Sequence, residues 1–233
     1  MLNSSLQNSK HKKQVKELKS SVPSDNSLNI SWQEFKQEVE NDLYDGYVER
    51  LAMLDKVKNL LSKDKFEKLT KDERKLIAGM KNTLPYNSGW FGSLEGAGFM
   101  KNVINEHADL ITKALDVIPQ DGKVLKKHFV QYIKLFDEAC QGQEKSPKIA
   151  CYTRFLAVIR PDFFVPINKK NEVRIRQALN SRAKISVDNY WEMLQEIHKK
   201  DWYQTEILIN SSDYELWSKR AAMLDAIYYK HED

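Results

Sequence analysis

Hydrophobic residues recur every three or four positions between Ser31 and Leu61, which is the spacing that one face of a helix requires. The apolar stripe consists of Trp32, Phe35, Val39, Leu43, Tyr47, Leu51, Leu54, Val57 and Leu61. Ser31 is followed three residues later by Glu34, the spacing of a capping box, so we expect one long helix to begin here. Gly46 lies inside this helix, and we expect a break or a close helix contact at that position.

Helical periodicity continues through the rest of the chain. Thr70 and Glu73 form a second capping box, and Ser212 with Glu215 forms a third one before the last helix. Five of the eight glycines fall between Gly79 and Gly98, which predicts an irregular Gly-rich loop. Alternating strand patterns are almost absent, so the predicted fold is an all-α, multi-helix globular domain with a long N-terminal helix.

The pattern divides the chain into three regions. Residues 1–29 combine Ser, Asn and Lys with isolated apolar residues and predict a flexible N-terminal arm; residues 30–84 predict an N-terminal helical hairpin, and residues 85–233 a C-terminal helical domain. No apolar run approaches the roughly 20 residues of a membrane helix, and the N-terminus lacks the apolar stretch of a signal peptide. With only two cysteines, the chain is expected to be cytoplasmic.

Charge is distributed unevenly along the sequence. Residues 121–184 hold 14 basic and 6 acidic side chains, a net charge of +8, whereas residues 185–233 hold 5 basic and 10 acidic side chains, a net charge of −5. A basic middle followed by an acidic C-terminal part predicts two surfaces for two different partners.

Catalytic motifs are hard to find in this sequence. The segment GSLEGAG lacks the Lys and Ser or Thr of a phosphate-binding loop, because Phe99 and Met100 follow its last glycine. Glu17-Leu18-Lys19 and Glu73-Arg74-Lys75 match a nuclease fragment only by chance spacing, and the five histidines are scattered. A nucleophilic pair of Cys140 and His128 stays open, although burial is the more common use. We therefore expect no catalytic site, no metal and no cofactor.

Nucleic-acid binding has better support from the segment NKKNEVRIRQALNSRAK. Its cationic side chains are Lys169, Lys170, Arg174, Arg176, Arg182 and Lys184, a density that neutralises phosphates. We expect Asn168 to start a short helix here, whose N-terminal N–H groups would also favour an anion. A solvated basic face, or a docking surface for an acidic protein, explains the same charges equally well.

The segment RFLAVIRPDFF predicts a structural pivot. Leu156 and Ile159 are expected to be buried on one side, while Arg154 and Arg160 pair with carboxylates such as Asp162 or cap a helix end.

Four blocks, GWFGSLEGAGFMKNVIN, TRFLAVIRPDFFVPINKKN, YWEMLQEIHKKDW and LWSKRAAMLDAIYY, resemble proteins encoded beside large ATPases in bacterial anti-phage and anti-plasmid defence loci. The chain is similar to the helical accessory subunit of Lamassu-type systems, and a related pattern accompanies Mcr-type modified-cytosine restriction genes. The resemblance covers roughly residues 85–230. Residues 1–84 lie outside it, and YQTEILIN after Trp202 lacks the expected Pro-rich turn.

The resemblance implies a non-enzymatic adaptor that bridges an SMC-like ATPase subunit and a nuclease subunit of the same operon and contacts DNA. Two alternatives from other classes stay open. The first is a small restriction enzyme whose carboxylates converge only in three dimensions, and the second is a DNA-binding module that acts on its own. None of these readings involves a membrane.

Overall fold

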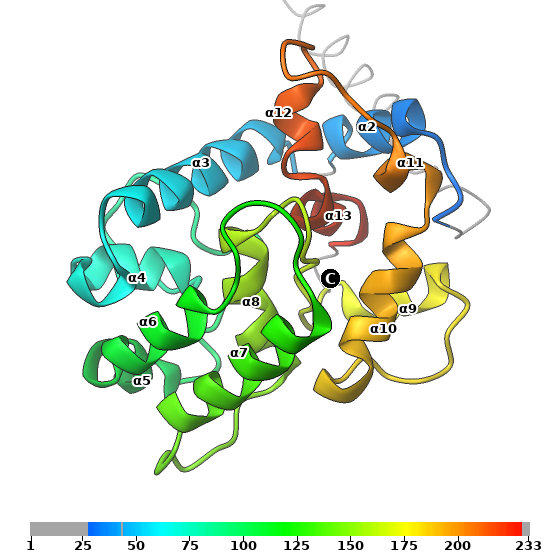
Figure 1. The fold of residues 1–233 in the computed structure, drawn as a ribbon. Coiled ribbons are helices and arrows are strands. Elements are labelled where there is room, and N and C mark those ends of the chain that lie inside the picture. The colour runs from blue at the N-terminus through cyan, green and yellow to red at the C-terminus, as the bar shows by residue number, and fades with distance from the viewer. Residues whose placement is uncertain (1–27, 43, 230–233) are drawn as a thin grey trace, which may run out of the picture.

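The computed structural model describes residues 28–42 and 44–229, and all regular secondary structure in this part of the chain is helical (Figure 1). Its elements are α2 (Trp32–Glu40), α3 (Tyr47–Lys63), the 3-10 helix η1 (Phe66–Lys68), α4 (Lys71–Ile77), α5 (Met100–Glu106), α6 (Ala108–Asp116), α7 (Lys126–Ala139), α8 (Ile149–Ile159), α9 (Glu172–Ala178), α10 (Val187–His198), α11 (Asp201–Gln204), α12 (Tyr214–Trp217) and α13 (Arg220–Tyr228). The all-α class is confirmed. Within the described ranges, no helix has both the length and the apolar character that crossing a bilayer requires.

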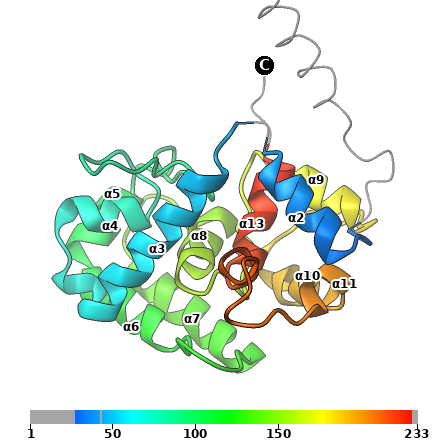
Figure 2. The same ribbon diagram turned by 90° about the horizontal axis from the view of Figure 1, so that it is seen from above.

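Helices α8 and α13 lie in the middle of the molecule, with α3 to α7 on one side and α2, α9, α10 and α11 on the other (Figure 2). Eight of the 11 residues of α8 and seven of the nine residues of α13 are buried. A helix that is buried on nearly all sides needs apolar residues all round, and the sequences of both helices supply them. These two helices therefore join the two sides of the fold.

The core is continuous across the sequence regions. Buried residues from Leu28 to Ala226 form one cluster, and α2 and α3 pack on α13 and α8. The division into a hairpin of residues 30–84 and a domain of residues 85–233 stays a prediction. The predicted arm of residues 1–29 lies outside the described residues, except for its last two positions.

The apolar stripe is divided between α2 and α3, so the prediction of one uninterrupted N-terminal helix is wrong, whereas the break expected at Gly46 is confirmed, because Gly46 is the N-cap of α3. The chain turns between them, and Gly46 lies so close to the Trp90 ring that an added Cβ would be 2.7 Å from Cζ2. The same Cβ would be 2.9 Å from Asp42 Oδ2. Gly46 therefore allows a close approach of the chain to Trp90 at the point where the helix breaks.

Two of the three predicted capping boxes are confirmed. The side-chain oxygens of Ser31 and Thr70 each accept a hydrogen bond from the main-chain N–H three residues later, and the main-chain N–H of each donates to the carboxylate of that later glutamate. The third prediction, at Ser212, is wrong. Helix α12 begins at Tyr214 without a side-chain cap, and α13 is a separate helix. Asp213 instead accepts hydrogen bonds from Trp32 Nε1 at 2.9 Å and Lys36 Nζ at 2.6 Å, which ties this turn to α2.

A stack of aromatic and cationic side chains holds the C-terminal helices together. The His198 ring stacks on Tyr203 with centroids 4.1 Å apart, and the Arg220 guanidinium lies 4.3 Å from the Tyr203 ring and 4.2 Å from the Trp217 ring. His198 Nε2 is 2.9 Å from the Phe163 carbonyl oxygen, which can only accept, so Nε2 carries the proton. Burial lowers the pKa of His198 to about 4.

We expect acid to destabilise the fold through His198. The unfolded histidine titrates near pH 6.5, so between about pH 6.5 and pH 4 the unfolded state binds a proton that the folded state does not. The free energy of unfolding should fall through this window as the pH falls, by up to about 3 kcal/mol from this group. Chemical denaturation across the window should give a flatter profile for His198→Phe than for the wild type. Equal profiles would contradict the assignment.

We expect Gly46→Ala to lower the free energy of unfolding by about 1–3 kcal/mol, because the new methyl group overlaps the Trp90 ring edge and Asp42. Gly98→Ala is the matched control, since an added Cβ there meets nothing within 4 Å. Removing backbone freedom from the unfolded chain should leave that variant unchanged or slightly more stable. In denaturant unfolding, the midpoint of Gly46→Ala should therefore fall below that of the wild type. The midpoint of Gly98→Ala should stay the same or rise.

Candidate functional site

The six cationic candidates lie on α9 and on the loops at its two ends. Lys169 and Lys170 precede the helix, Arg174 and Arg176 lie on it, and Arg182 and Lys184 follow it. We call these six residues the basic surface. Lys169, Arg182 and Lys184 are exposed, and the other three are half-buried. Glu172 is the single acidic residue between positions 169 and 184, so this surface has a strong net positive charge.

Arg176 has a structural role inside the basic surface. Its Nε lies 3.5 Å from Glu172 Oε1, and its Nη1 donates to the Arg182 carbonyl oxygen at 3.3 Å. Glu172 Oε1 also accepts the Ile185 N–H at 3.0 Å. These contacts fold the loop after α9 back onto the helix. The side chains of Arg174, Arg182 and Lys184 form no ion pair with the described residues, which leaves them for a ligand.

The expected helix start at Asn168 is wrong. Helix α9 begins at Glu172, its N-cap residue Asn171 makes no capping hydrogen bond, and the first turn carries the Glu172 carboxylate. Asn168 lies in a turn before the helix, where its Oδ1 accepts the Lys170 N–H at 2.8 Å. The side chains of Asn168 and Asn171 are both buried, and both donate through Nδ2 to Asp225. The predicted anion preference of the helix N-terminus therefore loses its basis, and the charge of the basic surface comes from side chains alone.

Asp225 of α13 is the centre of a buried polar network. Its Oδ1 accepts hydrogen bonds from Asn168 Nδ2 at 3.0 Å and Asn171 Nδ2 at 2.6 Å. Its Oδ2 accepts from Arg50 Nη1 at 2.6 Å and from the Phe91 main-chain N–H at 3.1 Å. Four donors from three distant segments thus satisfy one carboxylate that has no access to solvent. The network fixes the loop that carries Lys169 and Lys170.

Arg50 neutralises this carboxylate and joins it to a second one. Its Nε lies 3.0 Å from Asp42 Oδ2, and the side chains of all three charged residues have no exposed surface. The Arg50 guanidinium also lies 4.1 Å above the Trp90 ring. The two charge-assisted hydrogen bonds of the guanidinium and its cation–π contact with Trp90 are strong interactions in an interior without water. Arg50 Nη2 is buried without a hydrogen-bond partner among the described residues.

Sequence reasoning missed this network. The available signal was Asp225 in the apolar segment AAMLDAIYY, where a carboxylate on a buried helix demands a partner. Nothing in the sequence indicated that Phe91 belongs to the network. Its backbone takes a left-handed conformation with φ 65°, which is strained for a side chain of its size. Its N–H donates to Asp225, so the network also holds this strained turn.

The side chain of Arg154, from α8, reaches the C-terminal end of α4. It is buried, and its Nε and Nη2 donate to the carbonyl oxygens of Ile77 at 2.8 Å and Leu76 at 2.9 Å, while Nη1 donates to the Trp90 carbonyl oxygen. Burial lowers the pKa of the guanidinium, and the nearby charge of Asp225 opposes that shift. Arg154 thus joins the end of α4 to the Gly-rich segment.

Arg160 and Asp162, the other two pivot residues, form a two-point ion pair. Arg160 Nε and Nη2 each lie 2.8 Å from one oxygen of the Asp162 carboxylate. Arg160 also donates to the carbonyl oxygens of Pro119 and Gly122, which follow α6. Leu156 is fully buried and Ile159 partly so. These contacts stabilise the fold. Arg154 and Arg160 are therefore not among the positive side chains of residues 121–184 that can contact a ligand.

The structure does not bring the other candidate catalytic residues together into a site. His128 Nδ1 accepts the Leu125 N–H at 3.1 Å in the first turn of α7, and Cys140 is the C-cap of the same helix, about 18 Å further along it. These two side chains cannot form a nucleophilic pair, and burial raises the pKa of Cys140 to about 12. Glu73 is held in its capping box. Within the described ranges, no three His, Cys, Asp or Glu side chains gather into a metal-binding group.

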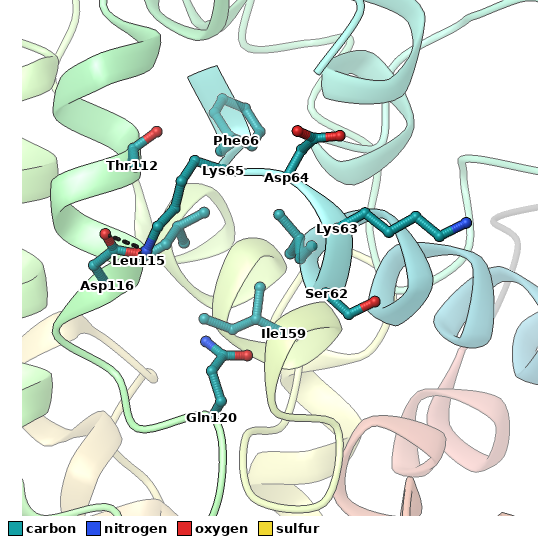
Figure 3. Close-up of a pocket in the computed structure, with 11 residues that line it drawn as sticks. Ser62, Lys63, Asp64, Lys65, Phe66, Thr112, Leu115, Asp116, Gln120 and Ile159 are labelled. Carbon is teal, nitrogen blue, oxygen red and sulfur yellow. Dashed lines mark hydrogen bonds and ion pairs between the residues drawn. The ribbon is translucent and has the colours of Figure 1, made fainter. Parts of the chain in front are cut away.

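A surface recess of about 220 Å³ lies where the end of α3 and η1 meet α6 and α8 (Figure 3). Its floor is apolar, with Leu61, Phe66 and Ile159, and the ion pair between Lys65 Nζ and Asp116 Oδ1, 2.7 Å long, lies at its edge. The recess is smaller than the roughly 300–1,000 Å³ that is typical of ligand sites. Its charged rim is balanced in sign, so we take the basic surface as the candidate functional site.

No family model, no curated protein and no solved structure matches this chain. The functional assignment therefore depends on the chemistry of the described residues and on the resemblance of the four sequence blocks.

We expect Asp225→Asn to lower the free energy of unfolding by about 3 kcal/mol, because it removes the charge that Arg50 faces in a dry interior. Asp116→Asn is the control. It breaks the ion pair between Lys65 and Asp116, whose side chains are 62% and 46% exposed, respectively. The free energy of unfolding should therefore fall by no more than about 1 kcal/mol. Urea unfolding of both variants tests this, and equal losses would contradict a central role for the network.

Proposed function

We propose that the chain is a non-enzymatic helical accessory subunit of a bacterial defence complex, which bridges an SMC-like ATPase and an effector nuclease and contacts DNA through the basic surface. The observation that supports the proposed DNA contact is the arrangement of the cationic side chains around α9. Exposed cations from both flanking loops are presented on segments that Asp225, Glu172 and Arg176 hold in place. Ordered cations neutralise phosphates with less loss of conformational freedom than mobile ones.

The form of the surface favours backbone contact over base reading. Helix α9 has seven residues, and on its outer side Val173 is exposed and Arg174 is half-buried. A short helix flanked by lysines and arginines on loops matches the sequence-independent phosphate contacts that position a protein on a duplex. We therefore propose binding that depends on salt and is indifferent to base sequence.

The bridging role is supported by the separation of charge. Residues 185–233 carry a net charge of −5, in contrast with the net positive charge around α9. A subunit that contacts both DNA and proteins benefits from such a division, because like charges keep each partner from the wrong surface. The resemblance of the sequence blocks supplies the proposed partners.

We expect the triple variant Arg174→Glu, Arg182→Glu, Lys184→Glu to lose DNA binding by the assembled complex. Each phosphate contact removed should reduce the slope of log K against log salt by about 0.9. The side chains are at the surface, so the melting temperature should change little. Fluorescence anisotropy with a duplex of mixed sequence, titrated at several salt concentrations, measures both quantities.

The matched control is Lys58→Glu, Lys71→Glu, Lys101→Glu, which makes the same change in net charge at exposed lysines of α3, α4 and α5. This control should retain most of the DNA affinity. If both triple variants lose affinity equally, the effect comes from net charge and the assignment to α9 is wrong. If the α9 variant loses a protein partner and keeps DNA, the basic surface is a protein-docking surface.

The alternative is a restriction protein that binds or cleaves DNA on its own. Tight binding by the isolated chain with a steep salt dependence favours the binding module. Magnesium-dependent nicking by the purified chain, lost on substitution of one carboxylate, would overturn the accessory-subunit proposal.

A further inference from the structure

The recess at the end of α3 has a size that selects among ligands. Its volume of about 220 Å³ is that of roughly seven molecules of liquid water at roughly 30 Å³ each. A molecule of about eight to ten non-hydrogen atoms fills such a space, because bonded atoms lie closer together than separate waters. A nucleotide or a larger cofactor needs a larger site. The size of the recess therefore favours a small ligand.

The apolar floor of the recess is held in place from below. Phe66 is 1% exposed, and its ring meets the Phe155 ring edge-on with centroids 5.9 Å apart. The Glu67 N–H donates to Thr112 Oγ1 at 3.0 Å, which joins η1 to α6. The floor is therefore preformed, and it can bury an aliphatic group without rearrangement.

One side of the recess presents hydrogen-bond donors that are not fully used. Lys65 Nζ lies 2.7 Å and 2.8 Å from the two oxygens of Asp116, so one of its three N–H groups is left for a ligand. The amide of Gln120 is directed toward Ile159 and forms no hydrogen bond with the described residues (Figure 3). An ammonium group and an amide together match the two oxygens of a carboxylate.

The other side of the recess is negative. Helix α3 has 17 residues and ends at Lys63, and the carbonyl groups of its last turn carry the negative end of the helix dipole. Asp64 follows directly, and its carboxylate forms no ion pair within the described ranges. The side chain of Lys63 extends away from the recess (Figure 3). This side therefore favours an ammonium group.

We propose that the recess binds a small zwitterion with an aliphatic group, the chemistry of a free branched-chain amino acid. The aliphatic group lies on the apolar floor, the carboxylate bonds to Lys65 and Gln120, and the ammonium group faces Asp64 and the end of α3. A residue within a peptide chain carries neither terminal charge, so it would contact the floor and leave both charged sides unused. A rim that is balanced in sign matches a ligand without net charge. This inference goes beyond the proposed function and does not depend on it.

The test is isothermal titration calorimetry of the isolated full chain with L-leucine as the probe. Leucine should bind at a single site. Three analogues each lack one part of it: 4-methylpentanoate lacks the ammonium group, 3-methylbutylamine the carboxylate, and glycine the aliphatic group. Each should bind about tenfold more weakly or worse, because each loses a charged hydrogen bond or the contact with the floor.

Lys65→Gln should weaken leucine binding by about tenfold, because the charged partner of the carboxylate is lost. Lys113→Gln is the matched control, since Lys113 is also 62% exposed and also pairs with an aspartate of α6, Asp109. The control should bind leucine as the wild type does. Gln120→Ala should weaken binding less than Lys65→Gln, because the lost hydrogen bond is neutral on the protein side. All three variants should keep the melting temperature of the wild type, because they change exposed side chains.

Failure of the wild type to bind leucine would overturn the proposal, and so would equal losses in the Lys65 and Lys113 variants. Equal affinities for 4-methylpentanoate and leucine would show that the negative side has no role and that the ligand class is wrong. If leucine does not bind and Lys65→Gln releases a partner subunit from the co-expressed complex, the recess is a protein-docking site instead. None of these measurements involves α9, so the proposed DNA contact is tested separately.

Discussion

The carboxylate of Asp225 is the interaction on which the remaining structure depends. It lies on the most buried part of α13 and satisfies donors from α3, from the Gly-rich segment and from the loop before α9. A buried charge without partners costs several kcal/mol, so these three segments can be rearranged only together. Arg50 extends the constraint to Asp42, and the break between α2 and α3 follows from the same packing, since Gly46 lies between Asp42 and the Trp90 ring that covers Arg50.

This constraint connects the interior with the surface. The amides of Asn168 and Asn171 bond to Asp225, and the two lysines between them are thereby placed at the edge of the fold. Arg176 and Glu172 do the same for the loop that carries Arg182 and Lys184. The basic surface is therefore a set of loops held by polar contacts on their inner side. Its outer side chains can change with little effect on stability, which is the arrangement expected of a binding surface.

The sequence predicted what short-range physics determines. Apolar spacing predicted the helices, and the spacing of Ser31 to Glu34 and of Thr70 to Glu73 predicted two capping boxes, because both signals depend on residues three or four positions apart. The prediction failed where a contact with a residue distant in the sequence determines the local structure. The sequence locates the break at Gly46 but not the close approach of Trp90 there. Asn168 precedes α9 in a turn, where its Nδ2 donates to Asp225 and its Oδ1 accepts the Lys170 N–H. The third capping box failed for the same reason, since Asp213 binds Trp32 and Lys36 of α2. For the candidate site, composition located the cations, but only the contacts separate Arg176, Arg154 and Arg160, which hold the fold, from Arg174 and Arg182.

The order of synthesis on the ribosome gives the Asp225 network a further consequence. Arg50 and its carboxylate are separated by 175 residues. At roughly 5–20 residues per second, the ribosome needs about 10 to 35 s to add Asp225 after Arg50. During that time the guanidinium of Arg50 has only Asp42 as a carboxylate partner in this network, and α8 lacks its neighbour α13. The two sides of the molecule therefore cannot lock together before α13 has been synthesised, and chains released before that point would expose the apolar surface of α8 to chaperones and proteases.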